Sequence, residues 1–162
     1  MGIEVEREQF TDEDHAQFSQ RLTQNLKVLR ELLVSPGFGA GETTIGVEVE
    51  MHLVDEALQP ACVNREVLAD AADPRCTLEI DAFNFEINSS PLRLAGRPFA
   101  QLDRELSELL AKVRKSAAKS GARVVLAGTL PTLTTSMLRG PVLSDSPRYR
   151  AMSRALREKR GA

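Results

Sequence analysis

The feature that most constrains how this chain folds is the stretch of residues 43–53, where apolar and polar side chains alternate. Alternation with a period of two is typical of a β-strand that has one buried face and one open face. The open face carries Glu48, Glu50 and His52 in succession. The buried face carries the apolar residues Ile45, Val47, Val49, Met51 and Leu53. The stretch therefore predicts a strand that presents two carboxylates and an imidazole on one side of a sheet.

Helical and extended segments follow one another along the rest of the chain. Helices are predicted where apolar residues recur at spacings of three and four, and Thr11 (with Asp14) and Asn64 are predicted to cap the first two. The predicted helices span residues 11–34, 64–72, 98–119 and 147–159. Strands are predicted over residues 76–89, as one bent strand or a hairpin, and over residues 122–128. This mixture predicts an α+β fold in which an antiparallel sheet is backed by helices.

Composition excludes several classes of protein. Of the 162 residues, 42% are apolar and 27% are charged, which is typical of one globular domain. No apolar run approaches the ~18 residues of a membrane-spanning helix, and the acidic N-terminus is no signal peptide. The presence of only two cysteines favours a cytoplasmic protein with reduced thiols and no membrane partner. A net charge of −2 argues against nucleic acid as a partner of the whole chain.

Acidic residues in the strand-like segments are the first candidates for chemistry. Glu48 and Glu50 lie about 7 Å apart along one strand face, from which both can reach a divalent ion, and oxygen ligands favour Mg²⁺ or Mn²⁺ over zinc. Glu79 and Glu86 also lie in strand-like sequence, so four carboxylates meet if these segments line one cleft. The alternative is a solvated outer face of the sheet. His52 is either a ligand, a residue that binds substrate, or a surface histidine.

The C-terminal segment is strongly basic. Residues 147–162 carry six bases against one acid, a net charge of +5. These arginines can contact the phosphate groups of a nucleotide. The alternative is a solvated helix face, which is the usual role of such a charge run. The arginines concerned are Arg148, Arg150, Arg154 and Arg157.

Several short segments, in the same order as in the family, resemble the type 2 glutamate–cysteine ligases. Residues 44–55 are similar to the family's opening strand, which reads Gly-Ile/Val-Glu-x-Glu. Residues 85–91 resemble its Leu/Phe-Glu-Ile-Asn-Thr/Ser pattern, and residues 126–131 and the pair Arg148-Tyr149 also match. The family comprises ATP-dependent carboxylate–amine ligases whose architecture is similar to that of glutamine synthetase, with an antiparallel sheet that forms part of a funnel-like active site.

The resemblance implies a reaction and a role for each matched residue. ATP phosphorylates the side-chain carboxylate of glutamate, and an amine such as cysteine attacks the acyl phosphate, as in glutathione biosynthesis. Arg148 and Tyr149 are implied to act near the substrate, and Arg148 and Arg150 at the nucleotide. The implied ligands of the catalytic Mg²⁺ (or Mn²⁺) ions are Glu48, Glu50, Glu79 and Glu86.

The sequence departs from the family pattern in two ways. Leu130 stands where many members have a histidine, and a leucine side chain can neither hydrogen-bond nor ligate. Family members are also more than twice as long, so we expect residues 1–162 to be the N-terminal part of one catalytic domain, inactive alone. Within it, residues 1–42 form a helix and linker, and residues 43–162 form the core. An exposed sheet edge would then favour a homo-oligomer. The alternatives are a binding or scaffold remnant that pairs with another chain, and an independent metal-binding domain.

Overall fold

The computed structural model describes residues 6–161, which fall into two compact units. One unit is Thr43–Asp145, and the other comprises the residues up to Glu42 together with those from Ser146 onward. Within residues 6–161, no helix combines the length and the apolar character that crossing a membrane requires.

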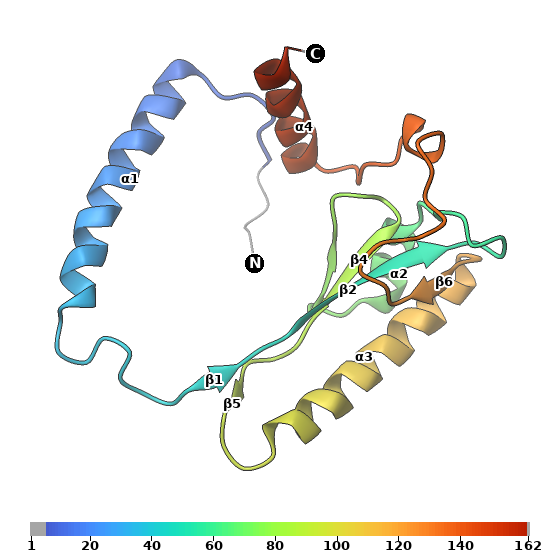
Figure 1. Cartoon of the computed structure of the whole chain (residues 1–162), viewed down its shortest axis with the longest axis horizontal. Coiled ribbons are helices and arrows are strands. Elements are labelled where there is room, and N and C mark those ends of the chain that lie inside the picture. The colour runs from blue at the N-terminus through green and yellow to red at the C-terminus, as the bar shows by residue number, and fades with distance from the viewer. Residues whose placement is uncertain (1–5, 162) are drawn as a thin grey trace. The chain divides into compact units, whose positions relative to one another are not determined.

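A four-stranded antiparallel sheet forms the centre of the Thr43–Asp145 unit (Figure 1). Its strands lie in the order β3 (Cys76–Leu78), β4 (Asn84–Asn88), β2 (Glu48–Val54) and β6 (Arg123–Val125). A separate two-stranded sheet pairs β1 (Thr44–Ile45) with β5 (Leu92–Arg93). The predicted α+β fold with an antiparallel sheet is therefore confirmed, and β3 and β4 show that residues 76–89 form a hairpin.

The strand predicted over residues 43–53 is interrupted at Gly46 and Val47. The Val47 N–H donates to Ser89 Oγ at 2.8 Å, and the Ser89 N–H donates to the Val47 carbonyl oxygen at the same distance. These bonds separate β1 from β2, so the prediction of one continuous strand is wrong at this point. The alternation still holds within β2, where Met51 and Leu53 are buried and Glu48 and Glu50 are exposed.

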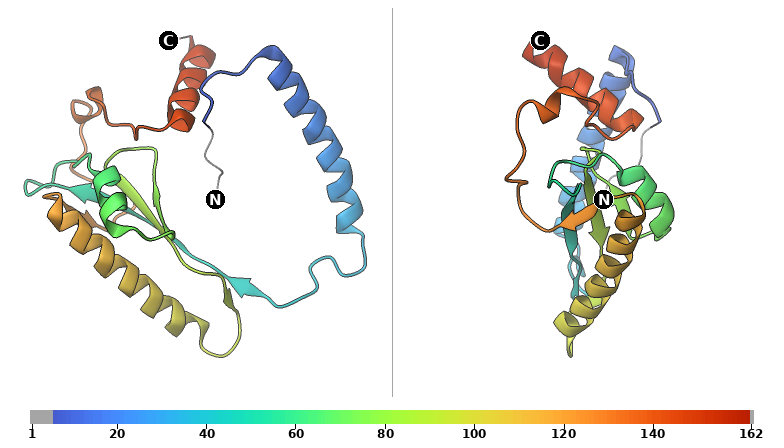
Figure 2. Two further views of the ribbon diagram at one scale, coloured as in Figure 1. Left: turned by 180° about the vertical axis from the view of Figure 1, so that it is seen from behind. Right: turned by 90° about the vertical axis from the view of Figure 1, so that its right-hand side faces the viewer.

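Two helices, α2 (Asn64–Ala71) and α3 (Pro98–Lys119), lie on the same side of the sheet (Figure 2). The apolar stripe of α3 packs there through Leu102, Leu109 and Val113, as its spacing predicts. The prediction fails at Phe99, in the first turn of α3, which is 67% exposed. The sheet contributes the inward-facing side chains of Met51, Leu53, Phe85 and Ile87 to this core. Glu50 and Glu86 alternate with these core residues along β2 and β4, so they lie on the other face of the sheet.

Asn64 does not cap α2, contrary to the prediction. Val63 occupies the N-cap position, and Asn64 is buried at the first position of the helix. Its amide nitrogen donates to the carbonyl oxygens of Asp81 and Asn84 and to Ser144 Oγ, at 3.2, 3.1 and 2.8 Å. A buried amide must find partners, and here it ties α2 to two distant loops instead of to its own helix.

The second unit contains α1 (Asp12–Leu33) and α4 (Pro147–Arg160). The predicted capping box of α1 is present, because Thr11 Oγ1 accepts from the Asp14 N–H and Asp14 Oδ2 accepts from the Thr11 N–H. Glu8 pairs with Arg150 of α4 at 2.7 Å. The stretch between the last strand and α4 belongs to the first unit and contains one turn of 3₁₀ helix, η1 (Met137–Arg139).

A carboxylate cluster as the candidate metal site

Strand register brings acidic side chains from three segments onto the open face of the sheet. Glu50 of β2 lies directly opposite Glu86 of β4, and Glu86 lies opposite Thr77 of β3. Directly paired residues of antiparallel strands project from the same face. Glu79 follows Thr77 by two residues, just beyond the end of β3. The hairpin and β2 thus place Glu50, Glu79 and Glu86 side by side.

One carboxylate oxygen from each of Glu50, Glu79 and Glu86 lies within 4.8 Å of the others. We call these three residues the carboxylate cluster. Glu86 is its most buried member, at 8% exposure. Its Oε1 accepts hydrogen bonds from Thr77 Oγ1 at 2.9 Å and from Asn88 Nδ2 at 2.7 Å. Both bonds reach the same oxygen, so they fix the orientation of the Glu86 carboxylate.

The electrostatics of the cluster favour a bound cation. Burial raises the pKa of the Glu79 carboxyl, and the adjacent Glu86 and Glu50 carboxyl groups raise it further. The hydrogen bond from the Ile80 N–H works in the opposite direction and is outweighed. Like charges this close are unfavourable unless a proton or a metal ion compensates them.

The donor set of the carboxylate cluster fits Mg²⁺ or Mn²⁺. Hard divalent ions take carboxylate oxygens as ligands, and they use few protein ligands because they retain several waters. Three convergent carboxylates on a partly open face satisfy both requirements. Structural and catalytic zinc sites typically include His nitrogen or Cys sulfur ligands, and neither occurs among the three residues.

Glu48 lies outside the carboxylate cluster. It is exposed, begins β2 and lies opposite Asn88, so it shares the open face with Glu50 but not the point of convergence. Of the four predicted metal ligands, the structure brings three together and leaves Glu48 at the rim. Its role as a ligand stays a prediction.

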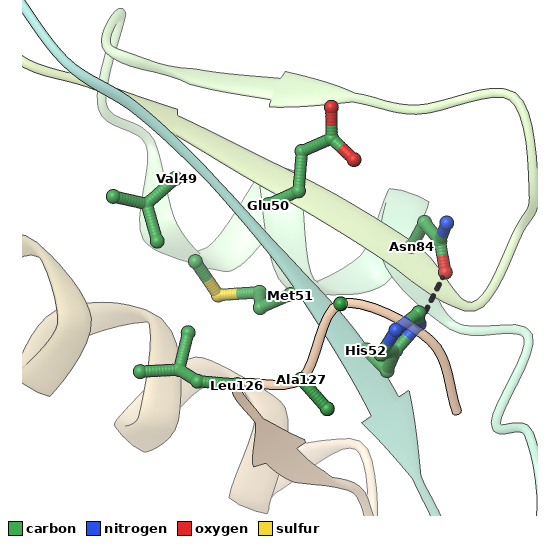
Figure 3. Close-up of a pocket in the computed structure, with 8 residues that line it drawn as sticks. Val49, Glu50, Met51, His52, Asn84, Leu126 and Ala127 are labelled. Atoms are coloured by element: carbon green, nitrogen blue, oxygen red, sulfur yellow. Dashed lines mark hydrogen bonds between the residues drawn. The ribbon is translucent and has the colours of Figure 1, made fainter. Parts of the chain in front are cut away.

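An open pocket of about 420 Å³ adjoins the cluster at Glu50 (Figure 3). His52 also lines it, and the His52 ring is held by a 2.8 Å hydrogen bond between Nδ1 and Asn84 Oδ1 and by stacking on Phe83. The remaining lining residues are Val49, Met51, Asn84, Leu126, Ala127 and Gly128. His52 is therefore a pocket residue and is not one of the three clustered groups.

The predicted substrate and nucleotide residues lie on α4, in the other unit. The Arg148 guanidinium lies over the Tyr149 ring at 5.6 Å, and Arg150 pairs with Glu8. Their roles beside the carboxylates remain predictions. Leu130, where many family members have histidine, is buried at 4% exposure and does not line the pocket.

Sequence reasoning missed several polar and small residues of this face. Asn84 and Asn88 alternate with Glu86 along β4, so the period of two contained a signal for them. Thr77 could be found only from the register of the hairpin. Leu126 to Gly128 lie in the segment that resembles the family. The strand predicted over residues 122–128 is wrong for these three residues, because β6 ends at Val125 and the chain then leaves the sheet to line the pocket.

The comparisons with known proteins agree with the geometry. The model of glutamate-cysteine ligase family 2 matches residues 44–161. The "Putative glutamate--cysteine ligase 2-3" of Rubrobacter xylanophilus is 39% identical over 121 residues, which cover 70% of this chain and 31% of that protein. The "Putative glutamate--cysteine ligase 2-2" of Mycolicibacterium vanbaalenii is 33% identical over 108 residues, or 66% of this chain and 28% of that protein. A protein with the same description in Mycobacterium sp. (strain KMS) is 31% identical over 111 residues, covering 68% and 29%.

No solved structure gives a significant match. The chain spans about three tenths of the length of the curated relatives it matches. The family match covers the sheet, both of its helices and α4, and it includes every residue of the carboxylate cluster. The chain belongs to glutamate–cysteine ligase family 2.

Proposed function

We propose that this chain supplies the metal-binding face of an ATP-dependent carboxylate–amine ligase. The reaction joins the side-chain carboxylate of glutamate to an amine through an acyl phosphate. The observation that carries the proposal is the convergence of Glu50, Glu79 and Glu86 within 4.8 Å on one sheet face. Membership of the family and the names of the relatives support the ligase class.

The carboxylate cluster suits phosphoryl transfer for an electrostatic reason. When bound, Mg²⁺ neutralises the phosphate oxygens and the charge that develops during transfer. The protein's part is to hold three carboxylates at fixed positions, which Thr77 and Asn88 do for Glu86. We assign Arg148 and Tyr149 to the substrate, and Arg148 and Arg150 to the nucleotide phosphates, as the family resemblance implies.

The complete reaction is proposed for the whole protein, because this chain spans about three tenths of its relatives' length. We expect the chain by itself to bind the divalent ion and to show no ligase turnover. Metal binding is therefore the property to test first, since it needs only residues that this chain contains.

Calorimetric titration of the chain with Mn²⁺ and with Mg²⁺, each with and without ATP, tests the proposal. Glu86→Gln and Glu50→Gln are expected to weaken Mn²⁺ binding by about tenfold or more, because each removes one of the three charged ligands. Glu108→Gln is the matched control, since Glu108 is an exposed acid on α3. Equal Mn²⁺ affinity in Glu86→Gln and the control would exclude the carboxylate cluster as the metal site.

The same titration decides the role of Glu48. A small loss of Mn²⁺ affinity in Glu48→Gln, about twofold, is expected if Glu48 acts only through its charge at the rim of the face. A loss as large as that of Glu86→Gln would make it a fourth ligand, as the sequence predicts.

A further inference from the structure

The Glu79 member of the carboxylate cluster lies where the hairpin leaves the sheet. The last paired residues of β3 and β4 are Leu78 and Phe85, so Glu79 begins the connection between the two strands. Glu50 and Glu86, by contrast, lie within paired strands, and their pairing fixes their backbones. The position of Glu79 therefore depends on the contacts that hold the connection.

A distant segment, residues 142–144, runs antiparallel to this connection and bonds to it. The Ala82 N–H donates to the Val142 carbonyl oxygen at 2.6 Å. The Ser144 N–H donates to the Ile80 carbonyl oxygen at 2.8 Å, and an isolated antiparallel bridge lies between these two bonds. The connection is thus held by a segment that is far away in the sequence.

Ser144 also fixes the peptide group that follows Glu79. The Ser144 hydroxyl donates to the Glu79 carbonyl oxygen. The N–H of the same peptide group belongs to Ile80, and it donates to Glu79 Oε2 at 3.3 Å. The carbonyl oxygen and the N–H of one peptide group lie in one plane. By fixing this plane, the Ser144 hydroxyl also directs the N–H that the Glu79 carboxylate accepts.

Asn64 determines the direction in which the Ser144 hydroxyl donates. Asn64 Nδ2 donates to Ser144 Oγ at 2.8 Å, and an amide nitrogen can only donate. Ser144 Oγ is therefore the acceptor of this bond, and its own hydrogen is available for the Glu79 carbonyl oxygen. Ser144 is 1% exposed and Asn64 is 2% exposed, so both side chains are shielded from solvent.

We propose that Ser144 is a positioning residue of the metal site, which holds the Glu79 carboxylate toward Glu50 and Glu86. This inference rests on the proposed function. Ser144 lies outside the carboxylate cluster and acts through the peptide group between Glu79 and Ile80. Without the hydroxyl, this peptide group loses the bond that fixes its plane, and the Glu79 carboxylate is no longer held beside its two neighbours.

Calorimetric titration of the chain with Mn²⁺ tests the proposal. Ser144→Ala is expected to weaken Mn²⁺ binding about tenfold, because residues that orient metal ligands contribute roughly this much to affinity. The matched control is Ser116→Ala, since Ser116 is also buried, at 2% exposure, but lies on α3, on the core side of the sheet. The control should bind Mn²⁺ as the wild type does. Equal Mn²⁺ affinity in Ser144→Ala and the control would overturn the proposal.

A double-mutant cycle with Glu79→Ala separates positioning from folding. If Ser144 acts through the Glu79 carboxylate, Ser144→Ala should cause no further loss of Mn²⁺ affinity in a chain that already lacks this carboxylate. The same loss in both backgrounds would show that Ser144 supports the fold alone, and it would refute the proposal. Ser144→Cys keeps the side-chain size and a weak S–H donor, so it should recover part of the affinity. It replaces Ser144→Ala in the cycle if that variant does not fold.

Water-proton relaxation by the bound Mn²⁺ gives a second readout, which a purely structural role would not change. Water replaces a carboxylate that leaves the ion, because hard divalent ions complete their coordination with waters. Ser144→Ala saturated with Mn²⁺ is therefore expected to relax water protons more strongly than wild type, as Glu79→Ala should. Raised relaxation in Glu79→Ala together with wild-type relaxation in Ser144→Ala would contradict the proposal.

The proposed function fails separately from this inference. Loss of Mn²⁺ binding in Glu86→Gln tests the metal site itself, whereas Ser144→Ala tests how Glu79 is held there. A chain that loses Mn²⁺ affinity in Glu86→Gln but keeps it in Ser144→Ala retains the metal site and loses the positioning role of Ser144.

Discussion

Two groups of acidic residues in the Thr43–Asp145 unit have opposite surroundings. The carboxylate cluster holds only acids within ligand distance of one another on the open face of the sheet. The second group is an ion-pair network formed by Asp73, Arg75, Glu105 and Lys112. Arg75 makes two bonds to Asp73, both at 3.0 Å, and one to Glu105 at 2.8 Å, while Lys112 reaches Asp73 at 3.1 Å.

The pKa shifts of the two groups have opposite signs. The hydrogen bonds from Arg75 hold the pKa of Asp73 far below its usual range. Burial works against the Glu105 charge, yet the bonds from Ser90 and Arg75 still lower its pKa. In the cluster, burial and neighbouring acids raise the pKa of Glu79. In the ion-pair network, Arg75 and Lys112 already compensate the acidic charges in the folded chain. In the carboxylate cluster, the repulsion between the acids is relieved only when a proton or a metal ion binds.

The largest expected effect is the response of the two groups to a divalent ion. Free Mn²⁺ at about a hundredfold above its Kd should stabilise the chain by ~2.7 kcal/mol, because it binds only the folded cluster. Thermal unfolding with and without Mn²⁺ measures this gain. Glu86→Gln should lose it and Asp73→Asn should keep it. A gain of equal size in Glu86→Gln would contradict the assignment of the cation to the cluster.

The second effect is the loss of the ion-pair network. Asp73→Asn should lower the free energy of unfolding by about 1–2 kcal/mol, because charge-assisted bonds from Arg75 and Lys112 are lost at a side chain only 9% exposed. Urea unfolding at neutral pH measures it. The folded-state pKa of Asp73 is depressed, so its contribution is present above the unfolded value of about 3.8 and is lost as pH falls below it.

The control for Asp73→Asn is Asp70→Asn. Asp70 pairs with Lys119 at 2.6 Å, but the Asp70 side chain is 35% exposed and that of Lys119 is 57% exposed, compared with 9% for Asp73. Exposed pairs contribute little to stability, so this variant should unfold almost as the wild type does. Equal losses in the two variants would show that the network has no special role.

The carboxylate cluster was only partly predictable from the sequence. Alternation along β2 identified Glu50 and the face it shares with His52, because strand side chains repeat every two residues. Which acids meet, however, depends on the register of β2 against β4 and on where β3 ends, and both are long-range properties. Glu79 joins the cluster because it lies just before the turn of the hairpin. Glu48 lies outside the cluster because the register of β2 against β4 places it opposite Asn88.

The elements of the fold that depend on nearby residues were also predicted correctly, whereas those that depend on residues far away in the sequence were not. The predicted bounds of α3 agree with the structure because they depend on Pro98, Gly121 and a stripe within one helix. The interruption of the first strand depends on Ser89, which lies 42 residues from Val47. The amide of Asn64 likewise bonds to residues 17 to 80 positions away. Residues this far apart in the sequence do not appear together in any local pattern, so the sequence could not predict these bonds.

The smallest expected effect concerns the cluster without metal. Glu79→Gln should raise the free energy of unfolding of the metal-free chain by ~0.5 kcal/mol near pH 7, because it removes one of several like charges facing one another across strands. Folding raises the pKa of Glu79 above the unfolded value of about 4.5, so at pH values between the two the folded chain holds a proton that the unfolded chain has released. The wild-type stability from this group is therefore lost as pH rises from about 4.5 through the folded pKa.

Urea unfolding of wild type and Glu79→Gln, repeated from pH 4 to pH 8, measures this difference. The variant's advantage should be absent at pH 4 and grow toward pH 8. The deficit of Asp73→Asn should stay constant over this range, because the contribution of Asp73 is lost only as pH falls below about 3.8. With saturating Mn²⁺, wild type should become more stable to urea than Glu79→Gln. The Glu79 carboxylate then binds the ion, and this stabilises the folded chain by more than the repulsion from neighbouring carboxylates destabilises it. A Glu79→Gln chain less stable than wild type without metal would mean that its surroundings already compensate the cluster, and the contrast with the ion-pair network would no longer hold.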